Sequence, residues 1–207
     1  MDSKKVFLLL NGEKPKSLPK LDDYHLICAT DGAYSYLKKH NITPDFISGD
    51  FDSITELPNH IETIHTPNQD FTDFDKILQI LYDKGFVNID VFGASGEQQD
   101  HFLGNLHTAI KWKKKLKLTF LDNYQRYFLA DKKTVIHNCK GKIISLIPFP
   151  KAKKISTKGF AYPLKNEDLS LQKRIGTRNK SIENQVKITF KSGNLFIFID
   201  HHTDKNE

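Results

Sequence analysis

The chain has 207 residues, and its 31 lysine and arginine residues against 25 acidic residues give a formal net charge of +6. This length can bury a sizeable core in one or two domains, whereas two cysteines are too few for a disulfide scaffold or a zinc site and suit the cytoplasm. Because no apolar run approaches the roughly 20 residues of a membrane span and the N-terminus lacks a signal-peptide pattern, we expect a cytoplasmic protein with no membrane role.

The first half of the chain predicts a mostly parallel sheet with flanking helices. Apolar runs at residues 6–10, 26–30 and 44–48 are typical of buried strands. Polar residues follow each run: Asn11 after the first, Asp31 and Gly32 after the second, and Gly49 after the third. In open α/β sheets, ligands bind at the carboxyl ends of the strands, so we expect these loops to face a common site.

The most informative stretch is Ser-Gly-Asp-Phe-Asp-Ser at residues 48–53. Its two carboxylates, Asp50 and Asp52, can hold a hard divalent cation, and Gly49 lets an anionic ligand approach the backbone. Mg²⁺ usually enters proteins on one or two carboxylates together with substrate phosphates, so the motif indicates phosphate chemistry. The alternative is an ordinary turn, because Asp, Ser and Gly are common loop residues.

A second acidic cluster spans residues 69–76 and opens an amphipathic segment with apolar residues at 74, 77, 78, 80 and 81. Thr72 is the expected N-cap of this helix, with Asp75 in the capping-box position. Asp73 gains from the helix dipole but is not needed for the cap. The cap therefore leaves Asp73, and the preceding Gln69 and Asp70, free for a functional role.

A third loop follows the predicted strand at residues 87–92 and leads into another helix. Gly93, Ser95 and Gly96 offer backbone N–H groups ahead of a helix N-terminus, which suits a phosphate. Asp100 is either the N-cap of that helix or a ligand-binding residue. The lysines at 111 and 113–115 are expected to form a solvated helix end that complements the C-terminal dipole.

The pattern changes after a predicted strand at residues 117–121. Helical periodicity gives way to short, partly alternating apolar runs at 127–129, 134–136, 142–149, 185–190 and 195–199, which predict half-buried antiparallel strands. Residues 1–110 hold 9 lysines against 17 acids, whereas residues 111–207 hold 22 basic residues against 8 acids. We therefore predict an α/β domain over residues 1–122 and a small antiparallel all-β, sandwich-like domain over residues 125–207.

These motifs, taken together and in this order, resemble the thiamine pyrophosphokinase family from about residue 6 to about residue 199. The resemblance is carried by Asp31-Gly32-Ala33, Pro44-Asp45, the motif from Gly49 to Ser53, Gln69-Asp70, Thr72-Asp73, Asp100-His101 with Asn105, Gly159, Tyr162-Pro163-Leu164 and Thr177-Arg178-Asn179. Three positions depart from the family pattern. A second glycine is usual at Ala33, an arginine at Gln98, and a small polar residue at Arg178.

The resemblance implies transfer of pyrophosphate from ATP to the hydroxyl of thiamine, with Mg²⁺ as the metal and a homodimer as the assembly. It assigns catalytic roles to Asp50, Asp52, Asp73 and Asp100, of which the first three would hold the metal. It assigns thiamine binding to Asp31, Gln69, Thr72, Thr177 and Asn179, and ATP binding to Asn11, Gly32, Gly49, Gly93, Ser95 and Gly96. The all-β domain would then serve thiamine binding and dimerisation. No residue stands out as a general base.

Three other readings compete with this one. A pyrophosphokinase for another hydroxymethyl heterocycle, such as a pterin, would share the scaffold and the metal site, because a fold does not determine the acceptor. A nucleic-acid-binding module would use the basic second half and its aromatic residues. A phosphatase with an Asp-x-Asp nucleophile usually carries that motif on the first strand of its domain, whereas Asp50 follows the third strand here.

Overall fold

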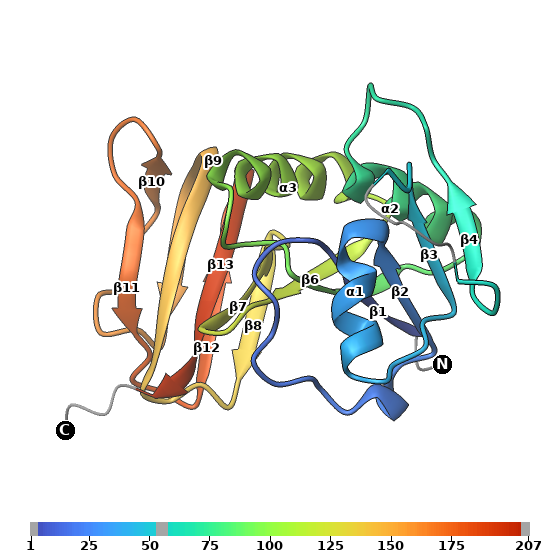
Figure 1. Ribbon diagram of the computed structural model, residues 1–207. Helices are drawn as coiled ribbons and strands as arrows, with labels where there is room; N and C mark the ends of the chain where they lie inside the picture. Colours follow the sequence, from blue (N-terminus) through green and yellow to red (C-terminus); the bar gives the residue numbers. More distant parts are fainter. Residues whose placement is uncertain (1–3, 53–57, 204–207) are drawn as a thin grey trace. The chain divides into compact units, whose positions relative to one another are not determined.

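The structure is a computed structural model that describes residues 4–52 and 58–203; Ser53, the last residue of the first acidic motif, lies outside the described residues. The chain forms two compact units, residues 1–123 and 124–207, and each is described by itself (Figure 1).

The first unit is built on a parallel sheet in the order β4-β3-β2-β1-β5-β6. Its strands are β1 (Lys5–Leu9), β2 (Leu26–Thr30), β3 (Phe46–Gly49), β4 (Glu62–His65), β5 (Asn88–Phe92) and β6 (Lys117–Leu121). Its helices are η1 (Leu21–Asp23), α1 (Asp31–Lys39), α2 (Asp73–Asp83) and α3 (Gln99–Trp112). The predicted mostly parallel sheet with flanking helices is confirmed.

All six strands are parallel, but the order in which successive strands are added reverses between β1 and β5, because β2 to β4 extend to one side of β1 and β5 and β6 to the other. Such a reversal opens a crevice at the carboxyl ends of the two strands, where ligands of doubly wound sheets bind. The loops after β1 and β5 meet at this point: the Gly12 N–H donates to the Gly93 carbonyl at 2.8 Å, and the Glu13 N–H to the Ser95 carbonyl at 2.9 Å.

The core of this unit follows from alternation along the strands. Phe7, Ala29 and Ile47 pack with Leu37 of α1 in one buried cluster. Phe120, on β6, instead meets Phe74 of α2 with ring centroids 6.0 Å apart. Strands covered by helices read as continuous apolar runs, which is why the sequence located β1, β2, β3, β5 and β6 to within one or two residues. β4, with the sequence Glu-Thr-Ile-His, is mostly exposed and has no such run.

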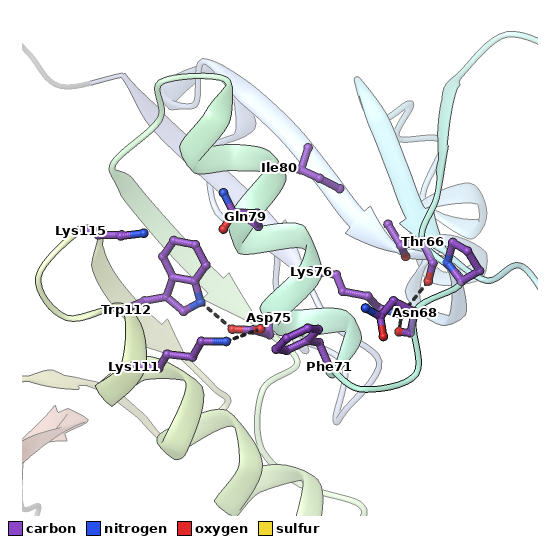
Figure 2. A pocket seen from close by; sticks show the side chains of 11 residues that line it. Thr66, Asn68, Phe71, Asp75, Lys76, Gln79, Ile80, Lys111, Trp112 and Lys115 are labelled. Atoms are coloured by element: carbon purple, nitrogen blue, oxygen red, sulfur yellow. Dashed lines mark hydrogen bonds and ion pairs between the residues drawn. The ribbon is translucent and has the colours of Figure 1, made fainter.

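The contact between α2 and α3 corrects the predicted role of the Asp75 side chain. Thr72 is the N-cap as predicted, since its Oγ1 accepts the Asp75 N–H at 3.2 Å. The Asp75 carboxylate, however, does not complete a capping box; it accepts from Lys111 Nζ and Trp112 Nε1, both at 2.7 Å (Figure 2). Lys111 lies in the last turn of α3 as predicted, with its side chain 46% exposed, and it also forms an ion pair with Asp75. The physical reason is burial: Asp75 is 8% exposed, so its charge needs partners from the neighbouring helix.

The second unit is antiparallel throughout the pairings described for it. Its strands are β7 (Gln125–Leu129), β8 (Lys133–His137), β9 (Lys142–Lys158), β10 (Glu167–Ser170), β11 (Gly176–Lys180), β12 (Gln185–Thr189) and β13 (Ser192–Thr203). The long β9 pairs with β10, β11, β12 and β13 and organises the unit. Its core gathers alternate residues of several strands, including Leu146, Val186, Ile188 and Ile197. The predicted antiparallel all-β fold is confirmed, although β10 and β11 were not predicted.

Candidate functional site

Asp31, the first residue of α1, supports the first acidic loop. Its Oδ1 accepts the Gly32 N–H at 2.7 Å, and its Oδ2 accepts the Phe51 N–H at 2.9 Å. A Cβ at Gly49 would lie 2.2 Å from the Asp31 Cγ, so only glycine permits this approach. The carboxylate of Asp31, 9% exposed, thereby holds the loop after β3 against the start of α1. The contact of Asp31 with thiamine, which the family resemblance implies, stays a prediction.

Asp50 lies in this loop as an ionised group held by neighbouring donors. The Asp52 N–H donates to its Oδ1 at 3.3 Å, and Gln69 Nε2 donates to its Oδ2 at 3.2 Å. These two bonds, the first more than the second, lower the pKa of Asp50 below its ordinary value of 3.8. Phe51 has a φ of 63°, a left-handed conformation that is rare for a bulky residue and that clusters at functional sites.

Lys76 fastens the loop that carries Gln69, and sequence reasoning missed it. Its Nζ donates to the carbonyls of Thr66 at 2.7 Å and Asn68 at 3.2 Å, and pairs with Asp73 Oδ1 at 2.8 Å. The side chain is only 9% exposed. One signal in the sequence could have revealed it: a lysine in the first turn of a helix opposes the helix dipole, so it needs a specific anionic or carbonyl partner.

The side chains of Asp50, Asp52 and Asp73 are carboxylates, the kind of ligand that hard cations such as Mg²⁺ prefer. Asp50 and Asp52 share one loop, and carboxylate oxygens are the ligands that Mg²⁺ takes together with phosphates. Asp73 is engaged with Lys76. Across residues 4–52 and 58–203 no three His, Cys, Asp or Glu side chains gather as a metal-binding group, so the assignment of Asp73 as a third ligand stays a prediction.

The loop after β1 brings a lysine to the sheet edge that the sequence did not single out. Lys14 Nζ donates to Asn11 Oδ1 at 2.9 Å and to the Leu10 carbonyl at 3.3 Å. Burial lowers the pKa of Lys14, and the charge of Glu97 opposes this shift. Asn11 thus holds a partly buried cation next to the loop after β5, and no motif in the sequence marks that lysine.

Gly93 and Gly96, in the loop after β5, allow this loop to pack closely against the loop after β1. Gly93 and Gly96 have φ values of 67° and 75°, which glycine adopts at no steric cost. A Cβ at Gly93 would meet the Leu10 carbonyl at 2.3 Å, and one at Gly96 would meet the Glu13 Cβ at 2.5 Å. The loop is also held by side chains: Asn105 Nδ2 donates to the Ala94 carbonyl at 2.8 Å, and Ser95 Oγ to Asp122 Oδ2 at 3.2 Å.

Gly32 likewise permits a close approach, because a Cβ there would lie 2.5 Å from the Asn11 Nδ2.

Asp100 is not the N-cap of α3, which is one of the two roles that the sequence left open. Gln98 occupies the N-cap without a side-chain bond, and Asp100 Oδ1 accepts the N–H of its neighbour His101 at 2.9 Å. A ligand-binding role for Asp100 therefore stays a prediction.

In the second unit, Thr177 and Asn179 both lie on β11. Asn179 is bound to the backbone of Tyr162: its Nδ2 donates to the carbonyl at 2.7 Å, and its Oδ1 accepts the N–H at 3.2 Å. The pairing of β11 with β9 is irregular between Gly176 and Asn179, and Arg178 there has a φ of 52°. Such irregularities re-aim side chains and occur next to functional sites.

Comparisons with known proteins give a consistent result. A family model described as thiamin pyrophosphokinase, catalytic domain, matches residues 19–120, and one described as thiamin pyrophosphokinase, vitamin B1 binding domain, matches residues 132–195. A thiamine pyrophosphokinase of Bacillus subtilis is 29% identical over 187 residues, which cover 85% of this chain and 87% of the relative. Thiamin pyrophosphokinase 1 of Caenorhabditis elegans is 27% identical over 193 residues, covering 81% and 76%.

Solved structures agree in fold. The crystal structure of thiamine pyrophosphokinase from Bacillus subtilis has a TM-score of 0.83 at 27% identity and covers 95% of this chain and 99% of that chain. The yeast thiamin pyrophosphokinase structure has a TM-score of 0.84 at 17% identity, covering 97% and 87%, and at that identity supports the fold alone. Among the described residues, none of the helices is long and apolar enough to cross a membrane.

Proposed function

This chain belongs to the thiamine pyrophosphokinase family, and we propose that it transfers a pyrophosphate group from ATP to the hydroxyl of thiamine. The hydroxyl oxygen forms a bond to the β-phosphorus, the bond from that phosphorus to the AMP oxygen breaks, and the hydroxyl proton is released. The observation that carries the proposal is the order of the two matched regions, the catalytic one in the first unit and the thiamine-binding one in the second. The comparisons lend no support to a pterin pyrophosphokinase or a nucleic-acid-binding module.

Mg²⁺ is the proposed metal, held by Asp50 and Asp52 with phosphate oxygens of ATP as further ligands. The low pKa of Asp50 supports this, because the carboxylate is ionised throughout the neutral range. Such an ion neutralises charge that develops on transferring phosphates. The chain's own contribution is positioning: Asp31 and Gln69 hold the acidic loop in place before substrate arrives, and phosphoryl-type transfer depends mainly on positioning and charge stabilisation.

We propose that the triphosphate of ATP lies at the reversal point between β1 and β5. Asn11 and the loop at residues 93–96 border this crevice, as does Lys14, whose charge suits a phosphate. Asp100, in the first turn of α3, is the proposed carboxylate on that side. Gly32 and Gly49 stay proposed ATP-binding positions through their backbones, and each also admits a neighbouring side chain that a Cβ would meet.

We propose that thiamine contacts Gln69, whose amide lies beside Asp50. Thiamine binding by Thr177 and Asn179, which the family resemblance implies for the second unit, stays a separate proposal. We further propose a homodimer, as the family resemblance implies, and a cytoplasmic location, which the two buried free cysteines suit. Sedimentation equilibrium tests the assembly: a mass of one chain at micromolar concentration would contradict the dimer.

The first experiment measures AMP and thiamine diphosphate formed from ATP, Mg²⁺ and thiamine. We expect Asp50→Asn, which keeps the shape and removes the charge, to lower turnover at least about 100-fold with little change in thermal midpoint. Asp22→Asn, an exposed acid of η1, is the matched control and should retain full activity. Near-normal turnover of Asp50→Asn would contradict the metal assignment.

A second experiment tests acceptor recognition. A site built to hydrogen-bond a polar heterocycle loses binding strongly when its partner is removed, so Gln69→Leu should raise the KM for thiamine far more than the KM for ATP. Calorimetry with thiamine, a pterin alcohol and a short oligonucleotide separates the rival functions. Tight pterin binding without thiamine binding would move the protein to another pyrophosphokinase, and salt-sensitive oligonucleotide binding alone would refute the enzyme assignment.

A further inference from the structure

A cavity of about 460 Å³ lies in the first unit between α2, the end of α3 and the loop that precedes α2 (Figure 2). Its wall includes Asn68, Phe71, Lys76, Ile80, Trp112 and Lys115. Asp50, Asp52 and Gln69 do not belong to this wall. The cavity adjoins the proposed reaction site through Asn68, the neighbour of Gln69, without including those three side chains. Its volume falls in the range of about 300–1,000 Å³ that is usual for small-molecule pockets.

The wall offers a pre-formed aromatic surface. Trp112 is held in one orientation, because its indole N–H donates to Asp75 Oδ1 at 2.7 Å. Phe71 borders the same space and is 47% exposed, although burying a phenyl ring is favourable by about 1.5–3 kcal/mol. Ile80 adds an aliphatic contact from α2 (Figure 2). A flat apolar ring can gain contacts here chiefly from Phe71 and Ile80, because Trp112 is only 4% exposed. Lys111 Nζ lies 4.6 Å from the centroid of the Phe71 ring and covers part of it.

The charges around the cavity favour an anion. Lys76 pairs with Asp73 and Lys111 pairs with Asp75, so these two cations are balanced. Lys115 lies over the Trp112 ring, 5.1 Å from its centroid, and over the ring of Tyr82 at 4.9 Å. It makes no ion pair within the part of the chain that the structure describes.

We propose that this cavity binds a small planar aromatic molecule that carries one anionic group. The ring lies against the Trp112 and Phe71 side of the wall, and the anion pairs with Lys115. Like-charge repulsion makes the same site unfavourable for a cationic ring such as the thiazolium of thiamine. This inference concerns a second site and does not depend on the proposed reaction.

The chain contains a single tryptophan, so its fluorescence reports directly on the cavity wall. We expect phenyl phosphate to change Trp112 emission saturably, with a Kd of about 1 mM or tighter. Inorganic phosphate and benzyl alcohol, which each lack one of the two recognition elements, should bind at least about tenfold more weakly. ATP and thiamine at saturating concentration should leave the Kd for phenyl phosphate unchanged.

Two variants and one control test the assignment of residues. Lys115→Met should weaken phenyl phosphate binding at least about fivefold, and Ile80→Phe, which fills the cavity, should weaken it as well. Lys114→Met changes the neighbouring lysine, which is outside the cavity wall, and should bind like the unmodified protein. Circular dichroism verifies folding of each variant. Absence of a saturable change, an equal Kd for the Lys115 and Lys114 variants, or competition by ATP would overturn the proposal.

Discussion

Substitution of Asp75 by alanine should destabilise the first unit well beyond the loss of a helix cap. The change leaves the buried indole N–H of Trp112 without its acceptor, which costs about 1–3 kcal/mol. The ion pair with Lys111, whose side chain is 46% exposed, adds at most about 1 kcal/mol. The bond from the Asp75 N–H to Thr72 is unaffected. A total of about 1–4 kcal/mol in the free energy of unfolding corresponds to a fall in Tm of roughly 2–16 °C for a chain of this size.

Thermal unfolding followed by circular dichroism measures this effect. Thr72→Ala, which removes the cap alone, should cost about 1 kcal/mol and serves as the comparison. Trp112→Phe removes the donor instead, so the double variant Asp75→Ala/Trp112→Phe should cost less than the sum of the two single changes by about 1 kcal/mol or more. Turnover per folded molecule should stay near normal, because Asp75 contacts neither proposed substrate. Strictly additive costs, or a loss for Asp75→Ala no larger than that for Thr72→Ala, would refute the reasoning.

Two further predictions concern the same unit. Gly49→Ala places a methyl group against the Asp31 carboxylate. It should lower the free energy of unfolding by about 1–3 kcal/mol and lower turnover by displacing the acidic loop. Gly104→Ala, whose added Cβ meets nothing within 4 Å, should be neutral or stabilising in the same unfolding assay, and equal effects of the two changes would contradict the packing argument. Burial, and then the hydrogen bond to Asp90, raise the pKa of Tyr24 well above its ordinary value of 10.0. Because the folded state holds the Tyr24 proton more tightly, the contribution of this group to stability is complete below pH 10 and is lost as the pH rises above 10. Tyr24→Phe should therefore flatten the decline of Tm in alkaline solution. An unchanged slope of Tm against pH would contradict this prediction.

Local patterns in the sequence were sufficient for most of the elements. Most strands of the parallel sheet are covered by helices, so their residues form continuous apolar runs that can be recognised without knowing the fold; β4, which is polar and mostly exposed, has no such run. Thr72 was identified as an N-cap for a similar reason, since a cap depends on residues three positions apart. β10 and β11 were not predicted because their sequences, Glu-Asp-Leu-Ser and Gly-Thr-Arg-Asn-Lys, are polar. These segments become strands only by pairing with β9.

Local sequence patterns were therefore enough to predict most strands and helices, the change from parallel to antiparallel strands, and which carboxylates follow strand ends. The tertiary structure decided what each polar side chain touches. Asp75 looked like a capping residue until Trp112, 37 positions away, proved to be its partner. Lys76 is marked by no motif, and its position follows from the carbonyl groups of Thr66 and Asn68, 10 and 8 positions away, which converge only when the loop folds. Helix and strand signals depend on neighbours along the chain, whereas the partner of a buried charge depends on neighbours in space.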